Sequence, residues 1–418
     1  MAPDLTAAGA GRRIADYVVL ATAPEVPLIA ADYWQRSAPS YASVDRLARS
    51  CAAGDGSVAL AYLALRAAPA DPGAHRDLAA ALGRLLGEQP WRQAEAAALI
   101  ALADARIWID YRPGTASSAA AGGAGLGWLA GLPRPSRRGS PPDGTAAASV
   151  LVPFRDARRG TRLRNLLACL HALRDQDPGA PLLVTVIETD AEPRCRDLIE
   201  PLADRYLFAR KDGLFSKSWA VNVGLRAAGH PSAPATPALT CVLDADILVD
   251  RGFAVRNAGR FADPGHDAHL PFRWSLALDG PSTGLAIRRR VRPPGDADAA
   301  GLRGLLLREP PGGCVWARTA LLHRIGGFDE RFEGWGGEDD DMIARLGRVA
   351  RVTRFDDDLL HLDHPRPPAA GPDGLPLNAH LAGRHEGADA WTGAGGFGDP
   401  GRFAPAAARP ILAPAGRR

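Results

Sequence analysis

Two aspartates, Asp244 and Asp246, follow the apolar stretch 238–243 with one residue between them. Alternate residues of an extended segment point to the same side, so the two carboxylates could hold a divalent ion against a diphosphate. The same pattern often arises by chance in a chain with many acidic residues, where it would be an ordinary solvated turn. Other parts of the sequence must decide between a metal site and a turn.

A pair of histidines, His361 and His364, lies three residues apart in Leu359-Leu-His-Leu-Asp-His-Pro365. This spacing beside a proline is compatible with one or both imidazoles facing a metal ion. An exposed pair of histidines in a loop is the alternative.

Four consecutive carboxylates, residues 338–341, come directly after Gly334-Trp-Gly-Gly337. Glycines give the backbone conformational freedom, and the first turn of a helix favours negative charge. An acidic helix start after a turn would explain the run without any chemistry. Together with the aspartates upstream and the histidines downstream, however, the run indicates a functional site.

The stretch from Phe328 to Asp341, Phe-Asp-Glu-Arg-Phe-Glu-Gly-Trp-Gly-Gly-Glu-Asp-Asp-Asp, resembles the C-terminal signature of the β-1,4-galactosyltransferase family. Members of that family are metal-dependent, inverting glycosyltransferases of GT-A fold. The resemblance covers about residues 149 to 365, with the motifs in family order. It implies transfer of a hexose, galactose or N-acetylgalactosamine first among them, from a UDP-sugar to a glycan or other hydroxyl acceptor.

The resemblance also implies a divalent cofactor, Mn²⁺ before other cations, with Asp246 and His364 as ligands and His361 as a third. In the family, one ligand at this three-residue spacing is a thioether, so a second histidine departs from the pattern. Imidazole favours borderline transition metals, and the departure could therefore change the metal preference.

The family's catalytic base falls on the second carboxylate of the acidic run. Its neighbours are expected to bind acceptor hydroxyls or to cap the helix. The predicted catalytic group is Asp339, Glu338 and Asp340.

Donor-binding residues follow mainly from the resemblance. Pro153-Phe-Arg155 resembles an element that contacts uridine diphosphate, although a solvated basic turn would explain its arginines as well. Asn222-Val-Gly224 resembles a segment whose small glycine lets the backbone approach the donor, and the tryptophan loop is expected to close over the donor sugar. Glu188, at a strand end, could accept hydrogen bonds from uracil or ribose. The predicted donor site comprises Pro153, Phe154, Arg155, Arg158, Glu188, Lys217, Asn222, Asp244, Trp335, Gly336 and Gly337.

Alternating apolar strands and amphipathic helices from residue 149 onward predict a parallel, doubly wound sheet with ligands at the carboxyl ends of the strands. The predicted fold class is α/β, a GT-A type doubly wound (Rossmann-like) mixed sheet with an N-terminal, mainly helical accessory region. The expected parts are a helical region 1–115, a flexible linker 116–147, a catalytic domain 148–368 and a Gly/Pro/Ala-rich, disordered tail 369–418.

Composition narrows the function further. The 418 residues carry a net charge of only +3 with no long basic block, so nucleic-acid binding is not indicated. Five scattered cysteines without a CxxC pair argue against a disulfide framework or a zinc cluster and favour a reducing cytoplasm. No signal sequence or transmembrane segment is evident, whereas animal members of the resembled family are anchored by an N-terminal helix.

Two other functions stay open at this point. A nucleotidyltransferase can share a similar sheet and paired aspartates, but it would not require the glycine-tryptophan loop before the four carboxylates. A non-catalytic sugar-nucleotide or glycan-binding protein could have kept the same fold. Hydrolysis or transfer of a labelled donor would separate these functions.

Overall fold

The structure is a computed structural model. It describes residues 6–116, 124–135, 146–156, 160–233, 236–292, 295–366, 370–371, 374–381, 383 and 390–403. The chain forms two compact units, which we describe one at a time. Unit 1 comprises 1–121, 274–285 and 299–310, and unit 2 comprises 122–273, 286–298 and 311–418.

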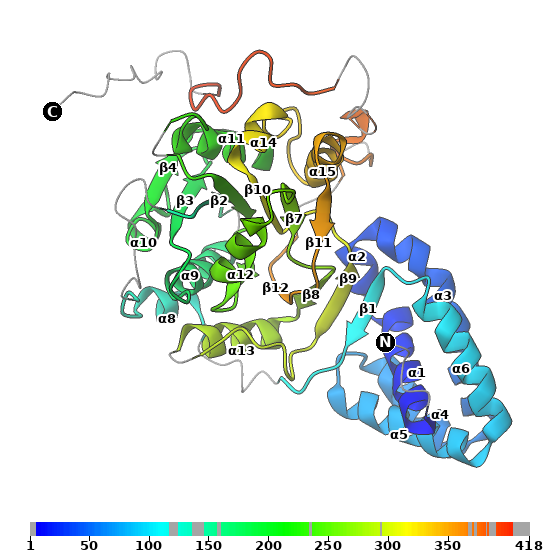
Figure 1. Cartoon of the computed structure of the whole chain (residues 1–418). Helices are drawn as coiled ribbons and strands as arrows, with labels where there is room; N and C mark the ends of the chain where they lie inside the picture. The colour runs from blue at the N-terminus through cyan, green and yellow to red at the C-terminus, as the bar shows by residue number, and fades with distance from the viewer. Residues whose placement is uncertain are drawn as a thin grey trace. The chain divides into compact units, whose positions relative to one another are not determined.

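Unit 1 contains the predicted helical region and two later segments of the chain. Its helices, blue to cyan in Figure 1, are α1 (Ala7–Thr22), α2 (Val26–Ile29), α3 (Ala31–Gly54), α4 (Gly56–Ala67), α5 (Pro72–Glu88) and α6 (Pro90–Asp104). Strand β1 (Ile109–Arg112) pairs antiparallel with β9 (Gly304–Arg308), which pairs antiparallel with β8 (Trp274–Leu278). The unit therefore includes strands from within the range 148–368 that the sequence assigned to the catalytic domain.

Two glycines, Gly11 in α1 and Gly83 in α5, let these helices approach each other closely. A Cβ atom on Gly11 would lie 2.6 Å from both the carbonyl oxygen of Ala79 and the amide nitrogen of Gly83. Around this crossing, an apolar core runs through all six helices and reaches Leu305 of β9. The helical region consequently completes its core with Leu305, which lies 201 positions after the end of α6.

Unit 2 is built on a seven-stranded sheet in the order β11-β7-β10-β5-β2-β3-β4. The strands are β2 (Ala148–Phe154), β3 (Leu182–Glu188), β4 (Arg205–Phe208), β5 (Leu239–Leu243), β7 (Ala268–Leu270), β10 (Cys314–Arg318) and β11 (Val352–Arg354). β2 pairs parallel with β3 and β5, and β10 pairs antiparallel with β5 and β7. The predicted α/β class with a mixed sheet and a helical N-terminal region is confirmed.

The helices of unit 2 connect these strands and cover the sheet. They are α8 (Leu126–Ala130), α9 (Thr161–Arg174), α10 (Arg196–Ile199), α11 (Lys217–Ala228), α12 (Phe253–Gly259), α14 (Thr319–Arg324) and α15 (Glu338–Val349), with 3₁₀ turns at Arg260–Ala262 and Ala379–Leu381. The division between the two units falls inside α13 (Gly280–Val291). The chain connects β2 to β3 through α9, and it returns from β4 to β5 through α11. Because these connections are right-handed and run in opposite directions, the two helices cover opposite faces of the sheet, as Figure 1 shows.

The strand order reverses at β2. From β2 the chain continues to β3 and β4 on one side of the sheet, and it then returns to β5 on the other side of β2. Ligands of such sheets bind at the carboxyl ends of the strands beside this reversal. Asp244 and Asp246 follow β5 at that edge, and a turn then leads into β6 (Ile247–Leu248). β6 pairs antiparallel with β12 (Leu359–His361), so His361 faces Ile247 across the pair. This pairing brings together two motifs that lie more than 100 residues apart.

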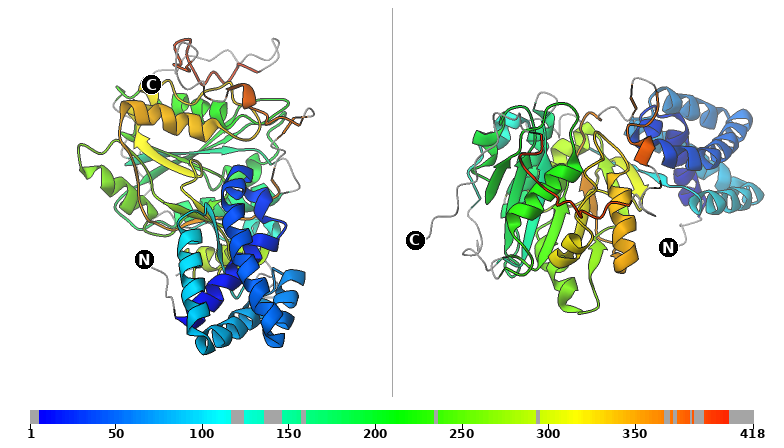
Figure 2. Two further views of the ribbon diagram at one scale, coloured as in Figure 1. Left: turned by 90° about the vertical axis from the view of Figure 1, so that its right-hand side faces the viewer. Right: turned by 90° about the horizontal axis from the view of Figure 1, so that it is seen from above.

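Part of the predicted disordered tail is ordered. Residues 390–403 lie beside α11 and α14, as the red segment in Figures 1 and 2 shows. The Trp219 indole donates to the carbonyl of Asp399 over 2.9 Å, and the Gly398 amide donates to Glu330 over 2.6 Å. Phe403 packs edge-on against Trp219 with ring centres 4.9 Å apart. The prediction of disorder is wrong for this segment because its aromatic and backbone groups find buried partners.

The predicted linker 116–147 is only partly described. Residues 117–123 and 136–145 lie outside the described residues, while α8 occupies the middle of the range. All five cysteines are buried and form no disulfide. None of the described helices combines the length and hydropathy that a membrane crossing requires.

Candidate active site

Asp246, His361 and His364 form a compact group in unit 2, with one possible ligand atom from each within 4.8 Å of the others. The Nε2 atom of His364 lies 3.0 Å from Oδ2 of Asp246, and Nε2 of His361 lies 3.6 Å from Oδ1. The Leu362 amide donates to the carbonyl of Asp246 over 2.8 Å, which fixes the two segments against each other. The predicted metal ligands are therefore neighbours in space.

Charge and burial oppose each other at this group. Burial alone would raise the pKa of Asp246, but the neighbouring imidazoles and the Arg162 guanidinium outweigh it, so the pKa lies below its ordinary value. Burial also lowers the pKa of His361 to about 4 despite the attraction of Asp246. The group therefore presents a carboxylate and a neutral imidazole, the forms that bind a metal ion.

A divalent cation fits these residues. Oδ1 of Asp246 is buried and has no hydrogen-bond partner among the described residues. A buried polar atom without a partner is unfavourable, and a cation would satisfy it. One carboxylate and two imidazoles suit Mn²⁺ and other divalent transition ions.

A second group lies at Lys217, whose side chain is nearly buried at the start of α11. Its Nζ atom lies 2.7 Å from Oδ1 of Asp244 and 2.9 Å from Oδ2 of Asp339. Burial would lower the pKa of Lys217, but the two carboxylates outweigh burial and raise it above its ordinary value. Lys217 therefore joins the residue after β5 to the acidic run as a permanent cation.

Asp244 and Asp246 do not act as one pair. The sequence predicted that both carboxylates lie on the same side of an extended segment. Instead the backbone turns after Asp244, and the Ile247 amide donates back to the Asp244 carbonyl over 3.2 Å. The turn directs Asp244 to Lys217 and Asp246 to the histidines.

The acidic run begins helix α15, as predicted. Gly337 precedes the helix with a φ of 92°, in the left-handed region that favours glycine. Asp341 is buried and accepts from Arg345 over 2.8 Å, and Arg345 also donates to the carbonyls of Ile325 and Gly327. Asp341 thus anchors the helix, while Asp340 is exposed on its surface.

The first two carboxylates of α15 have altered acidity. Burial and the charge of Asp339 raise the pKa of Glu338 to about 7. Burial and Asp244 raise the pKa of Asp339, and Lys217 opposes that rise. Both groups are therefore stronger bases than exposed carboxylates.

The tryptophan loop is partly open to solvent. Trp335 is 43% exposed, which excludes an ordinary core role. Gly334 and Gly336 flank it with φ angles of 77° and 104°. The Asn378 side chain donates to the Gly336 carbonyl over 2.8 Å. This hydrogen bond holds the loop at Gly336, next to the exposed ring of Trp335.

Several predicted donor residues make hydrogen bonds within the protein. Arg155 donates to the carbonyl of Thr189 after β3 and to those of Lys211 and Gly213 after β4, which ties the two segments together. Because three of its N–H groups bind backbone, Arg155 is an anchor of the loop in this structure. Pro153 and Phe154 are buried in β2. Arg158 lies outside the described residues.

Glu188 and Asn222 are also buried and bound internally. Glu188 accepts hydrogen bonds from the Cys195 amide and the Tyr206 hydroxyl, one at each carboxylate oxygen. Asn222 donates to the Phe328 carbonyl and accepts from the Phe328 amide, each over 2.8 Å. Both side chains therefore help to hold the fold, and their contact with a donor stays a prediction.

Gly224 lies at a close contact between a helix and the sheet. A Cβ atom there would lie 2.8 Å from Cδ1 of Ile187 and 3.1 Å from Cδ2 of Leu151. The glycine lets α11 pack closely on β2 and β3.

Two residues near the site were missed in the sequence. Arg162, at the start of α9, lies beside Asp246 and His364. Gly312 lies so close to Asp339 that a Cβ atom would be 2.1 Å from Oδ2. The Gly-Gly pair before β10 could have indicated a close approach, whereas no pattern in the sequence marks Arg162.

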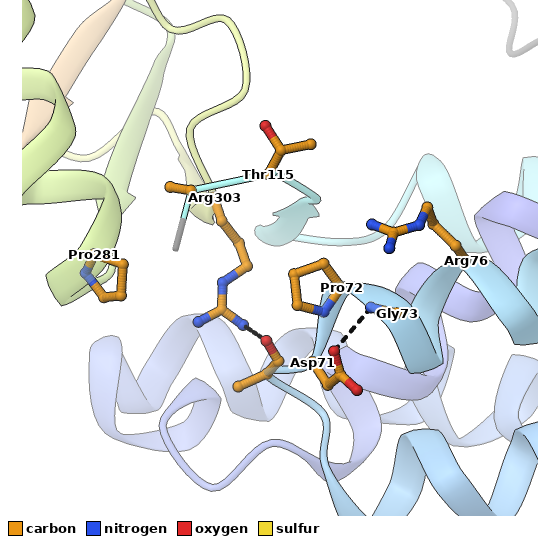
Figure 3. Close-up of a pocket in the computed structure, with 9 residues that line it drawn as sticks. Asp71, Pro72, Gly73, Arg76, Thr115, Pro281 and Arg303 are labelled. Carbon is orange, nitrogen blue, oxygen red and sulfur yellow. Dashed lines mark hydrogen bonds between the residues drawn. The ribbon is translucent and has the colours of Figure 1, made fainter. Parts of the chain in front are cut away.

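Unit 1 contains a separate hollow of about 460 Å³ (Figure 3). Arg303 donates to the Ala70 carbonyl beside it, and the Gly73 amide donates to Asp71 over 2.8 Å. Its lining residues are Ala70, Asp71, Pro72, Gly73, Arg76, Thr115, Ala116, Pro281 and Arg303. None of the predicted site residues is among them, so this hollow is distinct from the candidate active site.

Comparison with known structures gives matches over about half of this chain. A Drosophila β-1,4-galactosyltransferase 7 mutant, in complex with manganese, UDP-Gal and xylobiose, is 16% identical, with 52% of this chain and 71% of that chain covered and a TM-score of 0.31. S. aureus TarS 1–349 is 16% identical, with 51% and 60% covered and a TM-score of 0.33. GalNAc-T7 with UDP, GalNAc and Mn²⁺ is 12% identical, with 52% and 44% covered and a TM-score of 0.34.

Comparison of the sequence gives a more specific result. No curated protein sequence matches the chain. Residues 307–365, however, match a family model described as the N-terminal domain of galactosyltransferase. This segment contains the acidic run, the tryptophan loop and both histidines of the metal group. The predicted resemblance to galactosyltransferases is confirmed over residues 307–365, and with it the assignment of the chain as a glycosyltransferase.

Proposed function

We propose that this glycosyltransferase depends on a divalent metal ion and transfers a hexose from a UDP-sugar to a hydroxyl acceptor with inversion. Galactose and N-acetylgalactosamine are the first donors to test. The observation that carries the proposal is the presence of two separate polar groups around one turn. Asp246, His361 and His364 lie on one side, and Asp244, Lys217 and Asp339 lie on the other.

The metal group serves the leaving diphosphate. When bound, a divalent cation would neutralise negative charge on the diphosphate as the glycosidic bond breaks. Asp246 offers it a buried carboxylate, and the two histidines offer imidazole nitrogens. The burial of Asp246 keeps water from competing for that carboxylate.

The acidic group serves the acceptor. In an inverting displacement, a base on the acceptor side takes the hydroxyl proton while the oxygen attacks the anomeric carbon. Asp339 is our candidate for this base, because it is held in a fixed position by Lys217 and has a raised pKa. Glu338 and Asp340 are candidates for binding acceptor hydroxyls.

Trp335 is our candidate for covering the donor sugar. An exposed indole between glycines can close over a bound sugar and exclude water from the reacting atoms. Replacing Trp335 with alanine should therefore impair transfer while leaving the melting temperature almost unchanged.

Incubation of the full chain with labelled UDP-hexoses and a panel of hydroxyl acceptors tests the proposal. We expect transfer that needs Mn²⁺ and stops with a chelator. Release of pyrophosphate from a nucleoside triphosphate would favour a nucleotidyltransferase, and donor binding without turnover would favour a non-catalytic binding protein. Parallel assays with Zn²⁺, Fe²⁺ and Mg²⁺ determine whether the second histidine changes the metal preference.

A further inference from the structure

Arg162 contacts the metal group although no motif includes it. It is the second residue of α9, and its side chain is 28% exposed. Its Nη1 atom lies 3.8 Å from Oδ2 of Asp246, and its Nη2 atom lies 3.3 Å from Nδ1 of His364. The guanidinium thus neighbours two of the three predicted metal ligands at once.

The contact between Arg162 and His364 depends on which nitrogen of the imidazole carries a proton. A guanidinium can only donate, so Nδ1 must accept when Arg162 binds it. In a neutral ring the proton then lies on Nε2, which faces Asp246 over 3.0 Å. A metal ion beside Asp246 instead needs the lone pair of Nε2. Arg162 and the cation therefore require opposite tautomers of His364.

The structure provides a partner for the other tautomer. The carbonyl oxygen of Pro365 lies 3.0 Å from Nδ1 of His364 and can accept a proton carried there. A backbone carbonyl is a common partner for the second nitrogen of a metal-binding histidine. With this arrangement Arg162 loses its acceptor on His364, and a cation at Asp246 also repels it.

An anion near the start of α9 would give Arg162 a new partner. No described side chain caps the first turn of this 14-residue helix, so its amide groups can bind an anion. The buried Oδ1 of Asp246, which has no described hydrogen-bond partner, independently indicates that a cation belongs beside it. A diphosphate bound to that cation would lie within reach of the guanidinium.

We propose that Arg162 is a diphosphate-binding residue that Asp246 and His364 hold in place until the cation binds. This inference rests on the proposed function. It assigns Arg162 two opposite effects, since it opposes binding of the free cation and supports binding of the nucleotide diphosphate. A residue with a merely structural role would affect both in the same direction.

Calorimetry on the full chain tests the inference, with MnCl₂ alone and then with UDP at saturating Mn²⁺. Arg162→Gln should bind Mn²⁺ alone about fivefold tighter, because a positive charge close to the ion is removed. It should bind UDP about 10- to 100-fold more weakly, the loss expected for a charge-assisted hydrogen bond. Arg162→Lys keeps the charge and should restore part of the UDP affinity.

Arg174→Gln is the matched control, since it removes one positive charge from the other end of the same helix. It should change neither affinity, and thermal unfolding with a chelator should show that all variants are folded. Wild-type protein that binds neither Mn²⁺ nor UDP would overturn the proposed function. Wild-type binding of both, with Arg162→Gln weakening both or changing neither, would overturn the role of Arg162 alone.

Discussion

Asp244 and Asp246 lie two residues apart after the same strand, yet they belong to different environments. Asp244 is part-exposed and pairs with Lys217 over 2.7 Å. Asp246 is buried, and its Oδ2 atom lies 3.0 Å from Nε2 of His364. The backbone turn between them separates the two carboxylates, so the motif supplies one residue to each of two groups.

This separation suits a displacement reaction. A leaving diphosphate needs positive charge, whereas an acceptor hydroxyl needs a base, and one carboxylate pair cannot serve both needs at one point. Lys217 links Asp244 to the candidate base, and the histidines give Asp246 the character of a metal ligand. The following substitutions therefore test the two sides separately.

Asp246→Asn should have the largest effect. Removing the buried carboxylate should abolish transfer and weaken Mn²⁺ binding by more than about 100-fold, the upper range for residues that only support a metal ligand. Titration calorimetry with MnCl₂ measures the affinity. Asp250→Asn is the control, because Asp250 follows on the same segment but pairs with Arg256 over 2.6 Å. Equal Mn²⁺ binding by wild type and Asp246→Asn would show that Asp246 is not a metal ligand.

Asp339→Asn should act on the other side alone. The amide keeps the shape but cannot take a proton, so kcat should fall by roughly two to four orders of magnitude. Mn²⁺ and UDP affinities should stay within about twofold of wild type, because this group is separate from the metal ligands. Asp340→Asn, at the next and exposed position, should weaken acceptor binding but keep most of kcat. Near-normal turnover of Asp339→Asn together with inactive Glu338→Gln would move the base by one residue.

Gly312→Ala should disturb the acceptor side more mildly. The added methyl group would lie 2.1 Å from Oδ2 of Asp339 and must displace that carboxylate from Lys217. A shift of about 1 Å can cost about 100-fold in rate, so kcat should fall by about 10- to 100-fold with little change in UDP affinity. Gly347→Ala is the control, since its added methyl group, in helix α15 like Asp339, would meet no atom within 4 Å beyond the neighbouring backbone of that helix. Equal kcat values for both variants would show that Asp339 adapts freely.

The sequence predicted the sheet and the metal group well because both depend on local patterns. Apolar strands ending in polar residues indicated the carboxyl edge of the sheet. His361 and His364 lie together in the fold, as their spacing of three residues predicted. The roles of Arg155 and Asn222 could not be predicted in this way. Each binds backbone groups from a distant loop, and the sequence does not reveal which buried amides and carbonyls will need a side-chain partner.

Composition was a poor guide to order at the C-terminus and to the limits of the units. Glycine-rich residues 390–403 are held by partners such as Trp219 and Glu330, which lie at least 60 positions earlier in the chain. The helical region likewise takes β8 and β9 from the middle of the chain. Contacts between such distant segments leave no periodic signal, so local propensity cannot reveal them.

Glu338→Gln should have the smallest effect on catalysis, because glutamine can still hydrogen-bond acceptor hydroxyls, and its main effect should be on stability. The pKa of Glu338 is about 7 in the folded chain against an ordinary 4.5, because burial and Asp339 disfavour its charge. Between these values the unfolded chain releases the proton while the folded chain keeps it, so the stability associated with the neutral form is lost as pH rises through about 7.

Glutamine removes that loss. The melting temperature of Glu338→Gln should therefore match wild type near pH 4 and exceed it by a few degrees near pH 8. Asp340→Asn should show the opposite sign at pH 8, because it removes a charge that the first turn of α15 favours. Scanning calorimetry of the three proteins at both pH values measures these differences. A gain at pH 8 would show that the first turn of α15 holds a carboxylate with a raised pKa beside Asp339. No gain would contradict the raised pKa of Glu338 and leave that of Asp339.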